Sequence, residues 1–357
     1  MGWALAIDKT DIAKASLVET GSAPLGDGQA RLAVRRFALT ANNITYAAFG
    51  EIMGYWKFFP AREGGRLPVW GFAEVTESKA DGLEIGERIY GYLPAGDELI
   101  VGPARIGAGS FIDNSPHRAD LPAAYNRYTR CKGDPGYRQD REAVQMVLQP
   151  LFLTSWLIDL HLREEGFFGA AQVALTSASS KTALALAWLL HRNRPDGVAI
   201  EAMTSKRSMA FVAGTGFYDA ITLYDALKEL KSEPKRLIVD FAGDHQITTD
   251  IHEALGDALA ADIRVGAAHW EHAAPPKGLP GPKPVFFFAP DHVARRISEW
   301  GPGTFAQRYA ADWTQFAEDG AALFEEQELS GGEGALDAYT RLITNTAPPK
   351  AAMTVRV

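Results

Sequence analysis

From about residue 146 onward, short apolar runs alternate with segments of helical periodicity. Of all features of the sequence, this alternation limits the possible folds most strongly. It is typical of βαβ units, in which helices join parallel strands. The expected strands are 173–176, 198–203, 220–223, 237–241 and 263–265, and the expected helices are 182–191, 207–213, 224–231 and 248–259. The strand in RLIVDF is apolar on both faces, as a sheet covered by helices on both sides requires. The sequence therefore predicts an α/β fold with a doubly wound parallel sheet.

The two ends of the chain have a different pattern. Residues 1–145 contain short β-like runs at 31–39, 69–76 and 88–93, separated by Gly, Pro and Asp turns. Residues 294–300 and 305–327 are amphipathic and helical, Gly331, Gly332 and Gly334 indicate a flexible break, and 351–357 resembles a strand. A chain of 357 residues suits two domains. We expect one of 1–145 plus about 330–357, and another of 146–329 with a helical C-terminal extension.

Composition excludes several classes of function. The formal charge of −8 argues against a nucleic-acid partner, which needs clustered Lys and Arg, and favours a small-molecule partner. Cys131 is the single cysteine, so neither an internal disulfide nor a Cys-based zinc site is expected. The N-terminus does not resemble a targeting signal, and we find no run of about 18 apolar residues that would span a membrane. These features predict a cytoplasmic protein without a membrane partner.

The segment VALTSASSKTALALAWLLHR, residues 173–192, joins an apolar strand to an amphipathic helix through a turn of small residues. The turn residues are Ser177, Ala178, Ser179, Ser180, Lys181 and Thr182. Small side chains let a dinucleotide diphosphate approach free backbone amides and the positive end of the helix dipole. None of the three glycines of the usual G-x-G-x-x-G turn is present. The alternative is a Ser-rich N-cap that only starts a helix. The sequence leaves open whether Lys181 contacts the diphosphate or faces water.

The end of the next strand favours the cofactor interpretation. An NAD site has an acidic residue there for the ribose 2′-hydroxyl, whereas this chain has Thr204, Ser205, Lys206 and Arg207. Two hydroxyls and two cations suit a 2′-phosphate, so NADPH is preferred over NADH. Glu201 lies three residues too early and should face a helix or the core, although a shifted strand end could restore it to the strand tip. The alternative for the two cations is a solvated first helical turn, although cations are unfavourable near a helix N-terminus.

The order of features resembles the medium-chain dehydrogenase/reductase superfamily, in particular its zinc-free, quinone-oxidoreductase-like and double-bond-reductase-like members. The segments that carry the resemblance are LTANNITYAAFGEIMGYWKFFP, LPVWGFAEVTES and LEIGERIYGYLP in the first half, and VALTSASSKTA, AMTSKR, LIVDFAG and IRVGA in the second. The chain looks like a divergent branch in which the Ser-rich turn replaces the glycines. The resemblance implies a GroES-like β-barrel domain, a Rossmann domain, an NADP(H) site in a cleft between them, and a homodimer.

The resemblance also allows a prediction about metal binding. Zinc-dependent members of the superfamily carry a His-Glu pair near the position of Gly71 and a lobe with four cysteines. Here Trp70 and Phe72 flank Gly71, Cys131 stands alone, and the histidines lack H-x-x-x-H or H-E-x-x-H spacing. We therefore expect no metal.

Hydride transfer needs a group that donates a proton to the acceptor or polarises its oxygen. In the family the N-terminal loop supplies it, and the matching residues here are Asn43, Thr45 and Tyr46. Tyr46 is the first candidate for donor or orienter, and Asn43 could anchor the cofactor amide or the substrate carbonyl. A turn Asn and a packed Tyr are an equally good interpretation.

Aromatic residues predict an apolar wall for a flat substrate. They are Trp56, Phe58, Phe59 and Trp70, together with Tyr125 and Tyr128 in the irregular stretch 113–140. Core packing explains at least half of the first group, and an ordered surface loop could equally explain the second. At the far edge, the small residues Ala242, Gly243, Val265 and Gly266, followed by Phe288, leave room for the nicotinamide half of the cofactor.

The favoured function is an NADPH-dependent, metal-free reductase that acts on a quinone, an enone or another activated double bond. The first alternative is a sensor or regulatory protein that binds the cofactor without turnover. A second is a short-chain-type reductase, whose Y-x-x-x-K pair has a weakly placed match in Tyr224 and Lys228. NADPH consumption with a panel of acceptors separates the first two.

Overall fold

The computed structural model describes residues 2–265 and 278–357. The chain divides into two compact units, Met1–Val147 with Phe324–Val357, and Leu148–Leu323. We call them unit 1 and unit 2. Unit 1 contains two sheets that are mostly antiparallel, and unit 2 is built on one parallel sheet. The predicted fold class, a GroES-like barrel domain with a Rossmann domain, is confirmed by the full-length structural likeness reported below.

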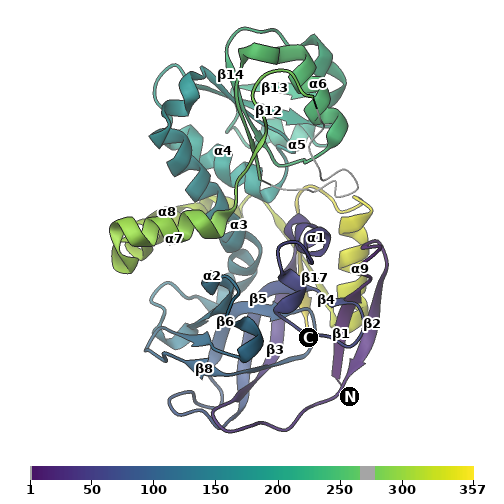
Figure 1. The fold of residues 1–357 in the computed structure, drawn as a ribbon, viewed down its shortest axis with the longest axis vertical. Coiled ribbons are helices and arrows are strands. Elements are labelled where there is room, and N and C mark those ends of the chain that lie inside the picture. The colour runs from purple at the N-terminus through teal and green to yellow at the C-terminus, as the bar shows by residue number, and fades with distance from the viewer. Residues whose placement is uncertain (1, 266–277) are drawn as a thin grey trace. The chain divides into compact units, whose positions relative to one another are not determined.

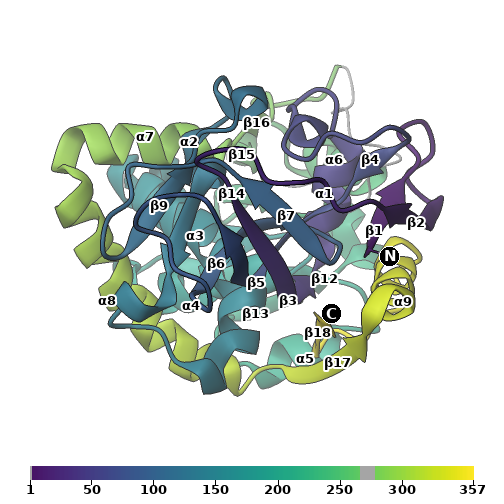
Figure 2. The same cartoon turned by 90° about the horizontal axis from the view of Figure 1, so that it is seen from below.

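The larger sheet of unit 1 pairs the C-terminal strands with a strand from the first forty residues of the chain. Its strand order is β17 (Glu325–Ser330), β18 (Ala351–Arg356), β3 (Ala30–Leu39), β5 (Pro68–Ser78), β6 (Arg88–Pro94), β10 (Arg127–Arg130), β9 (Ser110–Asp113) and β8 (Pro103–Ala104), and β7 (Glu98–Val101) also pairs with β3. Buried and partly exposed residues alternate along the first half of β3, which gives a sheet with one face in the core. Figure 2 shows β3, β5 and β6 as neighbours.

A smaller sheet of unit 1 has the order β2 (Ala15–Thr20), β1 (Gly2–Ile7) and β4 (Gly65–Arg66). Helix α9 (Gly331–Ile343) packs on β1 and β2 (Figures 1 and 2). The expected flexible break at Gly331, Gly332 and Gly334 is therefore wrong. A Cβ on Gly332 would lie 3.0 Å from Leu17, and one on Gly334 would lie 2.9 Å from Leu329, so two of these glycines allow close packing.

Further segments differ from the sequence-based expectation. The presumed loop around Asn43 is helix α1 (Ala41–Ala48), which begins after the N-cap Thr40. The presumed helix 305–327 ends as α8 (Pro302–Ala321), and the residues that follow form β17. The irregular stretch 113–140 contains the short helix α2 (Ala123–Asn126) beside β10.

The sheet of unit 2 has the order β13 (Ala220–Leu223), β12 (Ala199–Thr204), β11 (Gln172–Leu175), β14 (Arg236–Asp240), β15 (Leu259–Arg264) and β16 (Val285–Phe286), and all of its pairs are parallel. Helices α4 (Lys181–Asn193), α5 (Met209–Gly214) and α6 (His245–Leu255) follow β11, β12 and β14 (Figure 1). All residues of β11 and β14 are buried, as a sheet covered on both faces requires. The expected helix 224–231 is a short 3-10 helix, Tyr224–Glu229.

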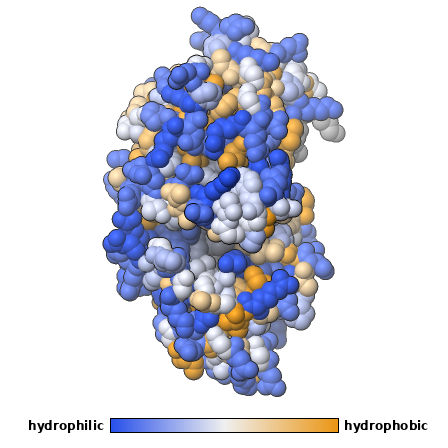
Figure 3. All heavy atoms as spheres, turned by 90° about the vertical axis from the view of Figure 1, so that its left-hand side faces the viewer, coloured by the Kyte–Doolittle hydropathy of each residue, from blue (hydrophilic) through white to orange (hydrophobic). Residues whose placement is uncertain are grey.

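Helix α3 (Glu142–Glu164), with the turn before it, is long and apolar enough to cross a membrane by length and composition, since its mean hydropathy over 18 residues reaches 1.3. The sequence expectation concerned an unbroken apolar run, whereas this helix contains polar residues such as Gln149 and Asp159 and meets the criteria by its mean hydropathy. Most of that window is buried inside the structure, where Phe152 stacks on Phe316 of α8 with ring centroids 4.8 Å apart. The core helix of a soluble protein meets the same criteria. Figure 3 shows one face of the molecule, on which hydrophilic side chains predominate and apolar ones form small groups.

The C-terminal helices of unit 2 pack against this core helix. Helix α7 (Ala289–Trp300) is followed directly by α8, with Gly301 between them at a φ of +78°. The indole of Trp156 on α3 donates to Asp312 at 2.8 Å, and the indole of Trp188 on α4 donates to Asp319 at 2.9 Å. Two buried indoles that satisfy their N–H on one helix fix its position against the parallel-sheet layer.

Candidate functional site

The turn after β11 folds as a strand, turn and helix without glycine. Ser177 adopts the left-handed conformation with a φ of +46°, which is the conformation that glycine usually provides. Ser180 is the N-cap of α4, and its hydroxyl accepts a hydrogen bond from the amide of Ala183 at 3.3 Å. A non-glycine residue in this conformation costs about 1–2 kcal/mol, so the surrounding contacts must hold it there.

Those contacts use part of the turn's hydrogen-bonding capacity. The amide of Ser177 donates to the hydroxyl of Tyr224 at 2.7 Å, and the amide of Ala178 donates to the carbonyl of Met203 at 3.2 Å. The hydroxyl of Tyr218 donates to the carbonyl of Ala178 at 2.8 Å. The expectation of a fully open turn is thus corrected.

Two backbone amides of the turn make no hydrogen bond within the described residues. The side chain of Ala178 is buried against Ala202 and Val212, so it faces the core. Within the described residues, the amides of Ser179 and Thr182 make no hydrogen bond, and both residues are half-buried. The first turn of a helix leaves such donors for a ligand.

A buried polar network, which we call the Thr176 latch, joins this turn to the end of the neighbouring strand β14. The hydroxyl of Thr176 donates to Asp240 at 2.6 Å and accepts from the amides of Phe241 at 2.9 Å and Ala242 at 3.0 Å. The same carboxylate oxygen accepts from the amides of Ala242 and Gly243, each at 3.0 Å. Burial raises the pKa of Asp240. The latch lies between β11 and β14, where the strand order reverses and where ligands bind in open α/β sheets.

The end of β15 adds a cation beside the latch. The Arg264 guanidinium is buried, donates to the carbonyl of Gly243 at 2.8 Å and lies 3.7 Å from Asp240. Its Nη1 has no hydrogen-bond partner among the residues that the structure describes. Val265 is half-buried and its amide donates to the carbonyl of Asp240 at 2.9 Å. Phe288 is half-buried at the N-cap of α7, and Gly266 lies outside the described residues.

The end of β12 carries the predicted 2′-phosphate residues. Thr204 is buried, Ser205 is half-buried, and Lys206 and Arg207 are exposed before α5 begins at Met209. Neither cation is in the helix: both lie exposed in the turn that precedes it, and their contact with a 2′-phosphate stays a prediction.

Two other residues near this edge have defined surroundings. Glu201 faces the core as expected, because it accepts hydrogen bonds from Arg236 at 2.9 Å and from Thr222 at 2.5 Å. Lys181 is half-buried, and burial lowers its pKa to about 8.

In unit 1, Tyr46 is the centre of an aromatic cluster, which we call the tyrosine cluster: Tyr46, Tyr55, Phe58, Trp70, Tyr92 and Tyr125. The Tyr46 hydroxyl accepts from Asn42 at 2.7 Å and from the indole of Trp70 at 3.2 Å. Burial raises the pKa of the Tyr46 phenol, which therefore stays protonated at neutral pH. The Tyr46 phenol also hydrogen bonds with the side chain of Tyr125.

Sequence reasoning missed two members of this arrangement. Asn42 lies one helical turn before Tyr46, a spacing that would have been apparent had helix α1 been predicted. The buried hydroxyl of Tyr92 has no hydrogen-bond partner in the described parts of the chain, and burial raises its pKa. A buried unsatisfied hydroxyl costs about 1–3 kcal/mol, which a ligand oxygen would offset.

The other predicted catalytic residues have different surroundings. Asn43 is buried and completes the cap of α1, since its oxygen accepts from the Thr40 amide at 2.7 Å and its nitrogen donates to the Pro68 carbonyl at 2.8 Å. It therefore has a structural role, in agreement with the alternative interpretation. Thr45 is half-buried on α1.

The predicted aromatic wall is partly core. Trp56 lies between two glycines, and a Cβ on Gly50 or Gly65 would approach its ring to 2.1 or 2.4 Å. Tyr128 is fully buried and donates to the carbonyl of Tyr92 at 2.6 Å. These two residues are corrected to core positions.

The remaining aromatic candidates belong to the tyrosine cluster. Phe58 is buried, whereas Tyr125 is half-buried and its ring centroid lies 4.6 Å from that of Tyr92. Across residues 2–265 and 278–357, no three His, Cys, Asp or Glu side chains come together as a metal site would require.

Comparison with solved structures defines the class of fold. CurA from Vibrio vulnificus in complex with NADPH is 13% identical, with a TM-score of 0.62 and coverage of 100% of this chain and 99% of that chain. The yhdH oxidoreductase from Salmonella enterica in complex with NADP is 15% identical, with a TM-score of 0.57 and full coverage of both chains. The quinone oxidoreductase from Coxiella burnetii is 14% identical, with a TM-score of 0.52 and coverage of 100% and 99%. The chain has the two-domain fold of the medium-chain dehydrogenases/reductases, as the sequence resemblance predicted.

The family follows from the sequence itself. The model of the family described as "Protein of unknown function (DUF2855)" matches residues 37–348, so the chain belongs to that family. No curated protein matches the chain in a sequence search.

Proposed function

We propose that this protein is an NADPH-dependent, metal-free reductase that acts on a quinone, an enone or another activated double bond. The observation that carries the proposal is the position of the small-residue turn beside the Thr176 latch, where the strand order of the parallel sheet reverses. Two solved proteins of the same fold, CurA and the yhdH oxidoreductase, were obtained with NADPH and NADP. The quinone oxidoreductase and an enoyl reductase share the fold and support the choice of acceptor.

The residues of unit 2 suit such a cofactor. The amides of Ser179 and Thr182 and the ammonium of Lys181 would hold the diphosphate at the start of α4. The exposed Lys206 and Arg207 would pair with a 2′-phosphate. Gly243, Val265 and Phe288 would flank the nicotinamide half. When bound, this cofactor supplies a hydride.

The residues of unit 1 suit an acceptor. In the proposal, the Tyr46 phenol donates a hydrogen bond to the acceptor oxygen and stabilises the negative charge that develops there. Asn42 and Trp70 hold the phenol oxygen, and the acceptor oxygen would take the place of Tyr125 as a partner of the phenol. Tyr125 and Phe58 contribute an apolar wall. We further propose a cytoplasmic homodimer that takes a small-molecule substrate.

The test of the cofactor assignment is a comparison of NADPH and NADH binding by isothermal titration calorimetry. We expect NADPH to bind at least tenfold more tightly. The variant Lys206→Glu should weaken NADPH binding by tenfold or more and leave NADH binding nearly unchanged. Lys231→Glu is the matched control, because exposed Lys231 precedes β14 and thus lies at the opposite edge of the sheet. An equal effect of Lys206→Glu on both cofactors would refute the 2′-phosphate assignment.

A second candidate is a protein that binds NADPH as a sensor, without turnover. It is favoured by the hydrogen bond from the Ser177 amide to Tyr224, because that amide is engaged within the protein. A panel of quinones and enones separates the two functions. NADPH oxidation with any acceptor supports the reductase, and saturable NADPH binding without consumption across the panel supports the sensor.

A further inference from the structure

Unit 1 contains a cavity of about 270 Å³ that includes neither Tyr46 nor Thr45 among its lining residues. Its walls come from the ends of β1, β2 and β4, from the segment after Trp56, and from the segment that links β6 to β7. Trp3, Phe58, Phe59 and Leu99 give it an aromatic and apolar part, and the rest of its lining includes polar residues, among them Thr20, Asp97, Glu98 and His117. Phe58 and Phe59 are buried, so the floor of the cavity is a rigid part of the core.

The cavity contains one cation without a counter-charge. Arg66 of β4 lines it, and no ion pair or hydrogen bond of its guanidinium is found among the described residues. The Nε of Arg66 is buried and unpartnered. A buried guanidinium N–H without a partner is costly, and an anion that accepts from it would recover that cost.

The acidic residues of the cavity already have partners. Asp97 accepts from the amide of Trp3 at 3.1 Å and from the hydroxyl of Thr20 at 3.4 Å. Glu98 pairs with Arg31 at 3.0 Å. Among the described residues, neither carboxylate forms an ion pair with Arg66, although all three residues line the same cavity.

We infer that this cavity binds a small aromatic carboxylate, with its carboxylate on Arg66 and its ring against Phe59 and Trp3. The planar guanidinium fork matches a carboxylate in a bidentate manner, and the aromatic lining matches a flat apolar body. The volume is slightly below the range of about 300–1,000 Å³ that holds drug-sized ligands, so the ligand has a single ring.

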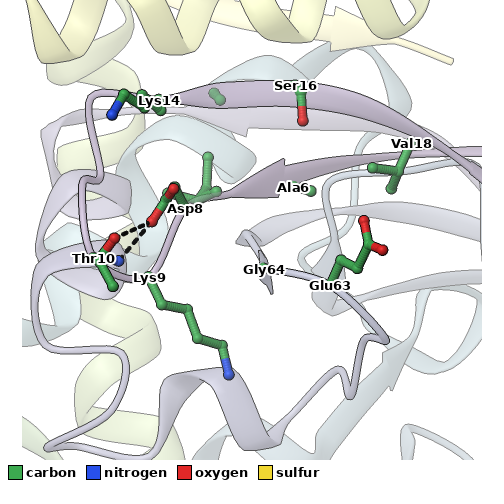
Figure 4. Close-up of a pocket in the computed structure, with 11 residues that line it drawn as sticks. Ala6, Asp8, Lys9, Thr10, Lys14, Ser16, Val18, Glu63 and Gly64 are labelled. Carbon is green, nitrogen blue, oxygen red and sulfur yellow. Dashed lines mark hydrogen bonds between the residues drawn. The ribbon is translucent and has the colours of Figure 1, made fainter.

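A second hollow of unit 1, of about 440 Å³, lacks these properties (Figure 4). Its charged residues are exposed, and most are paired locally. Asp8 accepts from the amide and hydroxyl of Thr10, each at 2.7 Å, and Lys14 pairs with Asp11 at 3.0 Å. Charged side chains that are exposed and already paired would contribute little binding free energy to a ligand. The cavity with Arg66 is therefore the stronger candidate for a binding site.

The test uses the full chain and phenylacetate as the probe, with binding measured by isothermal titration calorimetry. We expect saturable binding in the millimolar range or tighter. Acetate has the charge without the ring, and 2-phenylethanol has the ring without the charge, so each should bind at least tenfold more weakly. Inorganic phosphate should compete poorly, because the aromatic lining offers it nothing. Equal binding of 2-phenylethanol, or no binding of phenylacetate, would overturn the inference.

The variant Arg66→Gln should weaken phenylacetate binding at least tenfold. Arg62→Gln is the matched control, because Arg62 is exposed four residues earlier and does not line the cavity. Unchanged binding of phenylacetate by Arg66→Gln would overturn the inference. If that variant does not fold, the comparison of phenylacetate, acetate and 2-phenylethanol on the unaltered protein tests the inference instead. NADPH binding should be the same in the unaltered protein and in both variants. The test of this site is therefore independent of the test of the reductase proposal.

Discussion

Removing the hydroxyl of Thr176 is the sharpest test of how the turn is held. Thr176→Val keeps the shape of the side chain and deletes one oxygen that makes three hydrogen bonds. Thr176 and Asp240 are both buried, so water cannot replace the lost partner. The amide of Ala242 retains Asp240 as an acceptor, whereas that of Phe241 is left without one.

The magnitude follows from these bonds. Losing a hydrogen bond to a charged group costs about 1.5–3 kcal/mol, and leaving the Phe241 amide unpaired costs about 1–3 kcal/mol more. We therefore expect Thr176→Val to lower the free energy of unfolding of unit 2 by about 3–5 kcal/mol. With a denaturant dependence of about 3 kcal/mol per molar urea, the midpoint falls by roughly 1–1.7 M.

The assay is urea-dependent hydrogen exchange of peptides that cover β11 and β14, because it reports on unit 2 alone. Thr176→Ser is the control, since it keeps the hydroxyl and loses only a methyl group. Should the Val and Ser variants unfold within about 0.3 M urea of each other, the hydroxyl does not hold the turn and the latch argument is wrong.

Three further predictions concern packing, pH and turnover. Gly65→Ala should destabilise unit 1 by about 2–4 kcal/mol in urea unfolding, because the new Cβ would lie 2.4 Å from the ring of Trp56. Burial alone would lower the pKa of His252, but its hydrogen bonds to Asp262 at 2.9 Å and to a backbone carbonyl at 2.8 Å outweigh burial and raise it. The stability from this pair should therefore be complete below a pH of about 6.5 and decline as the pH rises through the pKa of the folded state, as urea midpoints at pH 6 and 8.5 would show. Tyr46→Phe should lower NADPH turnover with a responsive acceptor on the order of 10²-fold, with NADPH affinity unchanged.

Each of these has an outcome that contradicts it. For the glycine, Gly303→Ala is the control, because an added Cβ there meets open space, and equal stability of the two variants would mean that Trp56 moves aside at little cost. For the histidine, His252→Gln should abolish the difference between the two pH values, and a difference that persists assigns it to other groups. For the tyrosine, full turnover by the Phe variant would leave Tyr46 as a packing residue.

The parallel sheet of unit 2 could be predicted because its strands are locally determined. Continuous apolar runs such as RLIVDF can only be buried on both faces, and the edge strand Ala220–Leu223 has the predicted bounds. The turn after β11 could also be located, because it must connect such a strand to an amphipathic helix. Its cofactor preference remains a prediction.

Helix α1 and strand β17 show where local signals were insufficient. Helix α1 is only eight residues long, and its cap uses Thr40 with Asn43 in place of the usual acidic partner. The sequence of β17, EEQELS, is polar and has little tendency to form a strand. It is a strand because it pairs in parallel with β18, and because Glu328 forms ion pairs with Arg36 at 2.9 Å and Arg356 at 2.7 Å.

The sequence alone determined the class of fold, the place of the turn and the cations that follow β12, since each depends on residues close together in the chain. Only the tertiary structure decided which side chains are available to a ligand and which are engaged within the protein. It engaged Asn43 in a helix cap, enclosed Trp56 between two glycines, paired Tyr224 with the Ser177 amide and left Arg66 unpaired in a cavity. The physical reason is that hydrogen-bond partners and neighbours in the core come from segments far apart in sequence, which no local pattern encodes.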